Sequence, residues 1–133
     1  MDNWFFIAFA LFILFDALLI GWIWYRRRRP VLSSADKRII AERWTAIELA
    51  GDAHAVIEAD KLLDFALGKH GFTGSLGDKL KQAGPKFSDQ NAVWAAHKLR
   101  NQIAHDIASR PKAGDIEQTL RRFRRALADL GGL

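Results

Sequence analysis

Apolar residues are distributed in two different ways along this chain. The first part is an almost unbroken apolar run from Trp4 to Tyr25, in which Asp16 is the only charged residue. At a rise of about 1.5 Å per residue, a helix of this length spans about 33 Å, which matches a hydrocarbon core of about 30 Å. The pattern therefore predicts a transmembrane helix over residues 4–25, within an anchor formed by residues 1–30.

After this run, apolar residues recur at spacings of three and four, which is the pattern of amphipathic helices. The helices expected from this spacing cover residues 35–50, 53–71, 76–84, 91–105 and a last stretch between Pro111 and Gly131. Residues that can cap a helix precede the first four of them, namely Ser33 and Ser34, Asp52, Ser75, and Ser88 or Asp89. The residues predicted to be buried are Ile40, Trp44, Ile47, Val56, Ala59, Leu62, Leu63, Ala66, Leu67, Ala92, Ala96, Leu99, Ile103, Ile116, Leu120, Phe123, Leu127 and Leu130.

No segment alternates apolar and polar residues with the period of two that marks a strand. The connections between the expected helices are short, which favours neighbouring helices that run antiparallel. We therefore expect an all-α fold in which the membrane helix is followed by a five-helix antiparallel bundle, and a single domain over residues 31–133.

The residues that flank the apolar run predict its orientation. Aromatic residues suited to membrane interfaces stand at both ends, Trp4 at one and Trp22, Trp24 and Tyr25 at the other. Arg26–Arg29 then form a polybasic stop before Pro30, and basic residues remain on the cytoplasmic side. We expect the N-terminus outside the cytoplasmic (inner) membrane and the domain in the cytoplasm. A cleaved signal peptide is disfavoured, because no basic residue precedes Trp4 and no small-residue cleavage site precedes the arginines.

Asp16 would lie near the middle of the bilayer, where a carboxylate costs about 3 kcal/mol on insertion scales. Ala17 and Gly21 beside it are four residues apart, a spacing of small residues that favours close helix pairing. Two interpretations stay open. Either Asp16 binds a partner in the membrane or on another protein, or the surrounding apolar residues simply outweigh its cost.

Composition and charge narrow the chemistry of the domain. The chain has no cysteine, which excludes disulfides, thiolate metal sites and cysteine nucleophiles. Its four histidines show no pair at the i, i+4 spacing of helical metal sites, so neither a metal nor a cofactor is expected. The net charge is +5, and after the anchor the domain is only mildly basic. This balance permits RNA or acidic lipid as a partner without requiring either.

Candidate chemistry concentrates in residues 97–106. On an ideal helix with His97 at zero degrees, Arg100 lies at about 300°, Asn101 at about 40° and His105 at about 80°. A histidine can move a proton to or from a ribose hydroxyl near neutral pH, and a guanidinium can stabilise charge on a phosphate. Arg100 and His105 diverge by about 140°, so a site that uses both needs the reach of Arg100, an opening of the helix or a second subunit.

The stretch from Arg100 to His105, Arg-Asn-Gln-Ile-Ala-His, resembles the Rx4-6H motif of HEPN domains, the higher eukaryote and prokaryote nucleotide-binding family. The resemblance covers about residues 34–130 and implies a helical domain that cleaves RNA without metal at the interface of a homodimer. It implies that Arg100 contacts phosphate, His105 is the acid and base, and Asn101 assists orientation. Residues 57–63 and 96–101 also resemble a group of small membrane-anchored bacterial proteins of unassigned function.

A structural interpretation competes with the catalytic one. Arg100 can instead pair with Glu58 or Asp60 of the second expected helix and clamp the bundle. His105 and Asp106 can instead form the C-terminal cap of their helix. The domain would then be a non-catalytic interaction module or scaffold. His97 is expected to be a bystander or a substrate contact, and Lys98 a substrate contact. The other two histidines, His54 and His70, are expected at the surface.

A basic strip follows the last helix. It contains Arg121, Arg122, Arg124 and Arg125, with Arg110 and Lys112 before it. It could follow an RNA backbone, lie against anionic lipid, or be a solvated face opposite the apolar stripe. The predicted substrate contacts in this strip are Arg121, Arg122 and Arg125.

Overall fold

The computed structural model describes residues 3–27 and 32–133, and within these ranges it contains helices and no strand. The predicted all-helical fold is therefore confirmed. Arg28, Arg29, Pro30 and the expected domain boundary lie outside the described residues. The elements are α1 (Trp4–Arg27), α2 (Ser34–Ala50), α3 (Ala53–Lys69), α4 (Leu76–Ala83), the short 3-10 helix η1 (Gly84–Lys86), α5 (Gln90–His105) and α6 (Ala113–Asp129).

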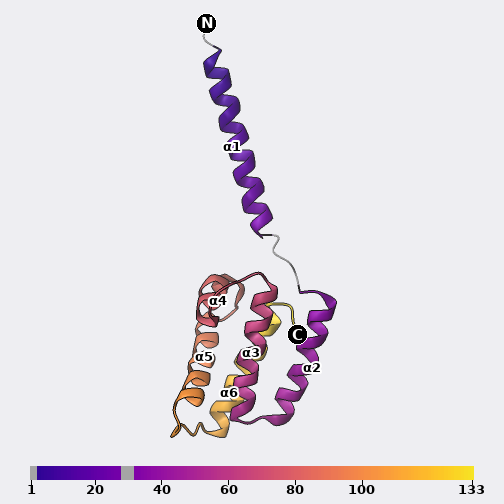
Figure 1. The fold of residues 1–133 in the computed structure, drawn as a ribbon, viewed down its shortest axis with the longest axis vertical. Coiled ribbons are helices and arrows are strands. Elements are labelled where there is room, and N and C mark those ends of the chain that lie inside the picture. Colours follow the sequence, from indigo (N-terminus) through magenta and orange to yellow (C-terminus); the bar gives the residue numbers. More distant parts are fainter. Residues whose placement is uncertain (1–2, 28–31) are drawn as a thin grey trace.

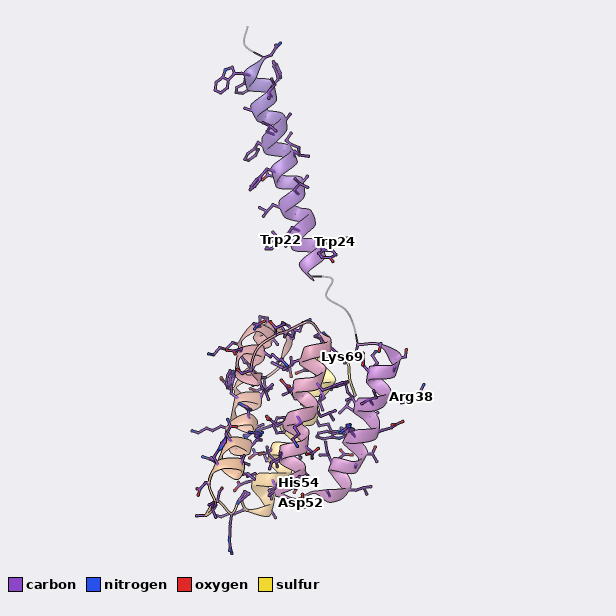
Figure 2. The ribbon with its side chains drawn as sticks, viewed as in Figure 1. Trp22, Trp24, Arg38, Asp52, His54 and Lys69 are labelled. Atoms are coloured by element: carbon purple, nitrogen blue, oxygen red, sulfur yellow. The ribbon has the colours of Figure 1, made fainter. Side chains whose placement is uncertain are left out.

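Helix α1 is long and apolar enough to cross a membrane. Its segment Trp4–Tyr25 has a mean hydropathy of 2.5, and none of that segment is buried against the rest of the protein. Figure 1 shows α1 as a helix separate from the bundle, and Figure 2 labels Trp22 and Trp24 near its C-terminal end. An exposed apolar surface of this size is stable only in a hydrocarbon phase or against another protein. The structure therefore agrees with the predicted span.

Helix α3 is the centre of the remaining chain and packs against α2, α4, α5 and α6. Among α2, α3, α5 and α6, each helix runs antiparallel to the next along the chain, whereas α3 and α6 run parallel (Figure 1). The C-terminal ends of α3 and α6 are joined by a hydrogen bond of 2.8 Å, in which His70 Nε2 donates to the carbonyl oxygen of Leu130. His70 is consequently buried, and the expectation that it lies at the surface is wrong. This hydrogen bond satisfies Nε2 and offsets part of the cost of burying a polar ring.

Helices α2, α3, α4 and α5 begin directly after residues that the sequence marks as caps. Ser33, Asp52 and Asp89 each accept a hydrogen bond from a backbone N–H of the first turn that follows. Ser75 and Asp78 form a reciprocal capping box at α4. Gly51 ends α2 in a left-handed conformation with φ of 59°, which a residue with a side chain adopts at a cost. These confirmed caps fix where α2, α3, α4 and α5 begin, and Gly51 fixes where α2 ends.

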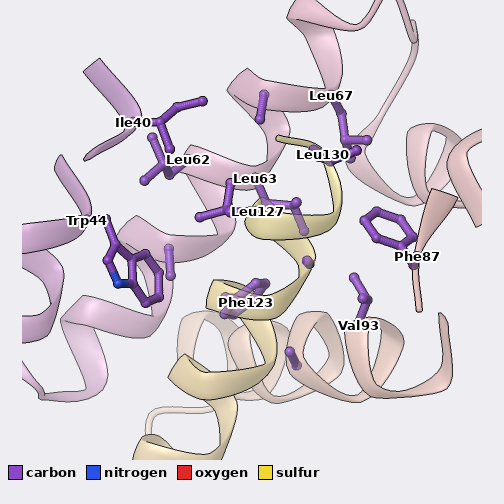
Figure 3. Close-up of a cluster of buried hydrophobic side chains, with 14 of the residues drawn as sticks. Ile40, Trp44, Leu62, Leu63, Leu67, Phe87, Val93, Phe123, Leu127 and Leu130 are labelled. Carbon is purple, nitrogen blue, oxygen red and sulfur yellow. The ribbon is translucent and has the colours of Figure 1, made fainter. Parts of the chain in front are cut away.

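The core lies where α2, α3, α5 and α6 meet (Figure 3). In α2, α3 and α6 the buried residues follow the predicted stripes, although Ile116 is only partly buried. The stripe predicted for α5 is wrong in detail. Val93 and Ala96 are its buried residues, while Ala92, Leu99 and Ile103 are half-buried. Because α5 packs against both α3 and α6, the side facing both neighbours includes Val93.

Candidate functional site

A buried carboxylate of α3 holds two side chains of α5. Asp60 is only 4% exposed, and its Oδ1 lies 2.8 Å from His97 Nδ1. Its Oδ2 lies 3.1 Å from Arg100 Nε, where it forms an ion pair. The antiparallel packing of α3 and α5 brings together residues that are about 40 positions apart. A carboxylate in such a place is stable only when cationic or hydrogen-bonding partners replace its lost water.

Asn101 connects the two partners of Asp60. Arg100 Nη1 donates to Asn101 Oδ1 over 3.0 Å, and Asn101 Nδ2 lies 3.3 Å from His97 Nε2. These four side chains form a closed ring, here called the Asp60 ring: Asp60, His97, Arg100 and Asn101. Together they hold the middle of α5 against α3 through polar contacts.

The ring fixes the direction of each hydrogen bond, because arginine can only donate. Asn101 must accept from Arg100 with its oxygen, so its amide nitrogen donates to His97 Nε2. His97 therefore carries its proton on Nδ1, which donates to Asp60. The ring thus contains a neutral imidazole of defined tautomer. The Nε–H of Arg100 is not aligned for a hydrogen bond to Asp60, so their contact is an ion pair.

The ring stays partly open to solvent. The side chains of His97 and Arg100 keep 15% and 25% of their surface exposed, compared with 6% for Asp60. Trp94 packs edge-on beside His97, with ring centroids 6.2 Å apart. The guanidinium of Arg100 is thus presented at the surface in one fixed orientation, an arrangement that can bind an anion without first ordering the side chain.

Glu58, the other predicted partner of Arg100, lies elsewhere. It accepts a hydrogen bond of 2.7 Å from Lys61, and His54 Nε2 is 3.8 Å away. The Lys61 hydrogen bond lowers the pKa of Glu58 below its ordinary value of 4.5. Two residues along a helix turn a side chain by about 200°, so Glu58 and Asp60 face opposite sides of α3.

His105 stands outside the Asp60 ring. It is the last residue of α5 and is exposed, and its side chain has no hydrogen bond or ion pair with any described residue. Asp106 follows as the C-terminal cap and accepts a hydrogen bond from the N–H of Ala108. The separation of about 140° between Arg100 and His105 is retained, because α5 is continuous between them. Because Asp60 and Asn101 also hold Arg100 in place, its reach does not bring both side chains to one phosphate within one subunit.

The predicted basic strip divides into two parts. Arg121, Arg122 and Arg125 line a groove of about 700 Å³ between α5 and α6, here called the arginine groove. Arg124 points elsewhere and lies 3.4 Å from Glu48 of α2. The sequence could place these four residues on one helix but could not show which neighbour each would face. Lys98, also predicted as a substrate contact, is exposed on α5.

A second groove, which sequence reasoning missed, lies between α2 and α3. It measures about 570 Å³ and is mainly apolar, with Ile39, Ala46 and Phe65 among the residues that line it and charged residues, including Arg43 and Glu58, beside them. The signal in the sequence was the additional apolar positions of α2 beyond its buried stripe, of which Ile39 is 40% exposed.

Residues 3–27 and 32–133 contain no group of three or more histidine, aspartate or glutamate side chains placed to hold a metal ion. No family model, curated protein or solved structure matches this chain.

Proposed function

We propose that this protein is a membrane-anchored HEPN-like domain that binds RNA and cleaves it without metal as a homodimer. The observation that carries the proposal is the contrast along α5. Arg100 and Asn101 are held in fixed orientations by Asp60 and His97, while His105 is exposed at the end of the same helix. A fixed anion-binding group and a free acid and base are the two parts that metal-independent phosphodiester cleavage needs.

In the proposed reaction, His105 accepts the proton of a ribose 2′-hydroxyl, and the 2′-oxygen attacks the adjacent phosphorus. The bond from phosphorus to the 5′-oxygen breaks, and the leaving oxygen takes a proton from a histidinium. The products are a 2′,3′-cyclic phosphate and a free 5′-hydroxyl. Arg100 of the partner subunit stabilises the charge that develops on the phosphate oxygens, and Asn101 beside it orients them. A second subunit is required because Arg100 and His105 diverge within one chain.

The anchor fits this function as a tether. We propose that α1 spans the cytoplasmic membrane with its N-terminus outside, because Arg26–Arg29 follow the apolar run. Confinement to a membrane raises the effective concentration of subunits and favours a dimer of modest affinity. A helix pairing through Asp16 would act in the same direction.

A non-catalytic interaction module is the second candidate, and the Asp60–Arg100 ion pair favours it. The carboxylate, 3.1 Å from Arg100 Nε, offsets the positive charge that would attract phosphate. In that case the Asp60 ring fastens α5 to α3, and the apolar groove between α2 and α3 receives a protein partner.

The test uses the full chain in detergent micelles with mixed RNA and EDTA. Parent protein should release fragments ending in 2′,3′-cyclic phosphate, and Arg100→Ala and His105→Ala should each abolish this. Mixing the two inactive variants should restore about one quarter of the parental activity, because about half of the dimers are mixed and each holds one intact site. Absence of cleavage by a folded parental dimer would favour the interaction module.

A further inference from the structure

The arginine groove continues into an exposed stripe of α5. The residues of this stripe are separated by four, three, four and three positions, so they lie within about 80° of one another around the helix. Four of them are exposed and Ala95 is half-buried. The stripe consists of Asn91, Ala95, Lys98, Gln102 and His105. Its first two residues also line the arginine groove, so one surface, polar except at Ala95, leads from the groove to His105.

The groove offers guanidinium groups that other side chains do not fully occupy. Arg122 has no hydrogen bond or ion pair with any residue that the structure describes. Arg125 donates through Nε to Ser88 Oγ over 2.8 Å, which leaves its two terminal nitrogens available. Arg121 pairs with Glu117 one turn earlier, at an exposed position. Planar guanidinium groups of this kind bind phosphate oxygens in pairs.

The carboxylates in the groove are already engaged in the fold. Asp89 accepts a hydrogen bond from the N–H of Ala92 and caps α5. Asp129 Oδ2 accepts two hydrogen bonds of 2.8 Å from Ser88, one from its N–H and one from its hydroxyl. These local bonds satisfy acceptor positions that would otherwise compete for the arginines, so the groove keeps cationic donors for a ligand.

We propose that the arginine groove binds the phosphate backbone of single-stranded RNA and that the α5 stripe leads this strand to His105. The delivery to His105 rests on the function proposed above, whereas the binding does not. A strand fits better than a lipid surface, because the site is concave and continues along α5 for about 21 Å, from Asn91 to His105. Asn91 and Gln118 in the groove add amide groups that can hydrogen-bond to bases.

The chain provides a matched control for charge. Arg121→Gln with Arg122→Gln removes two charges from the groove. Arg38→Gln with Arg124→Gln removes two charges outside it, since Arg124 pairs with Glu48 and Arg38 lies on α2 (Figure 2). Both double variants change the net charge equally, so a difference between them reports on the groove and not on overall attraction.

Binding is measured with the full chain in phosphatidylcholine discs, in EDTA, using a fluorescent 2′-O-methyl oligoribonucleotide of about 12 nucleotides. This probe lacks the attacking hydroxyl and stays intact. The groove variant should bind at least about tenfold more weakly than the control variant near physiological salt. Its plot of log affinity against log salt should be shallower by about 1.4, because each phosphate contact on a single strand contributes about 0.7.

Equal affinities of the two double variants, or no binding by the parent, would overturn the proposal. A separate experiment tests whether the groove binds lipid, using discs that contain photoactivatable phosphatidylglycerol. If the groove variant loses lipid cross-linking while RNA binding is unchanged, the groove faces the membrane and the proposal fails.

Parent protein that binds through the groove but never cleaves ordinary RNA would refute the ribonuclease function alone. Cleavage that is unaffected in the groove variant would refute the groove alone.

Discussion

Asp60 and Glu58 lie two residues apart on α3, and the sequence offers both as partners for Arg100, yet they occupy opposite environments. Asp60 faces α5, is 4% exposed and holds His97 and Arg100. Glu58 borders the apolar groove toward α2 and pairs with Lys61 at the surface. A carboxylate is therefore buried within a polar ring on one face and belongs to a more exposed ion pair on the other.

The two carboxylates differ in the cost of losing their partners, although the lengths of their contacts are similar. A buried carboxylate without its partners retains a desolvation penalty of several kcal/mol, whereas an exposed one regains water. Both residues make short contacts, and distance alone does not distinguish them: His97 Nδ1 is 2.8 Å from Asp60, and Lys61 Nζ is 2.7 Å from Glu58. Burial of the carboxylate and of its partners decides how much stability depends on each.

The largest expected effect follows from removing Asp60. Asp60→Ala leaves Arg100 and His97 half-buried without their acceptor, and it should lower the free energy of unfolding by about 3 kcal/mol. Urea denaturation of the full chain in detergent micelles, followed by circular dichroism, measures this. Glu58→Ala is the matched control on the same helix and should cost at most about 1 kcal/mol. Equal losses for the two variants would contradict the contrast between the two faces.

A smaller effect is expected for His97, which makes one bond to Asp60 and one to Asn101. His97→Ala should cost about 1–2 kcal/mol, because Asp60 and the Asn101 amide each lose one hydrogen bond while Asp60 keeps its ion pair with Arg100. Nitrogen-15 NMR of the imidazole supplies an independent test. Near neutral pH, Nδ1 should carry the proton and Nε2 should not. The opposite tautomer would mean that Asn101 presents its oxygen to His97, and the ring directions given above would be wrong.

His105→Ala should scarcely change stability, with a shift within about 0.5 kcal/mol, because the side chain is exposed and forms no hydrogen bond or ion pair with a described residue. The two histidines of α5 lie only eight positions apart, yet His97→Ala and His105→Ala are expected to change the stability by different amounts. Thermal unfolding of both variants in the same detergent measures the difference. A large loss from His105→Ala would show that this histidine supports the fold, as the capping interpretation requires.

The sequence predicts the local features of this fold well and the long-range polar pairings poorly. Ser33, Asp52 and Asp89 mark helix starts because capping depends on residues within one turn. The pairing of Asp60 with His97 depends on how α3 and α5 rotate against each other, which no local spacing determines. His70 was misplaced for the same reason, because its partner is a carbonyl 60 residues away.

The candidate site shows the same contrast between local features, which the sequence predicts, and long-range pairings, which it does not. The motif could be located on α5, and its angular spread could be calculated, because both depend only on a regular helix. Helix geometry alone could not show which arginines of α6 line a groove. Arg122 and Arg124 are two positions apart, and only the packing of α5 and α2 on either side of α6 assigns one to the arginine groove and the other to Glu48.

The smallest expected effect is the pH dependence of Glu58. The Lys61 hydrogen bond lowers its pKa in the folded state, so below pH 4.5 the unfolded chain binds more protons at this residue than the folded one. Its contribution to stability is therefore fully present above pH 4.5 and is lost as the pH falls through the lowered pKa. Comparing Glu58→Gln with the parent should show a difference of about 0.5 kcal/mol near neutral pH that disappears in acid and weakens with added salt. If the stability difference between Glu58→Gln and the parent persists in acid, the Glu58 side chain contributes through its packing beside the groove. The contributions of Glu58 and Asp60 would then both depend on burial.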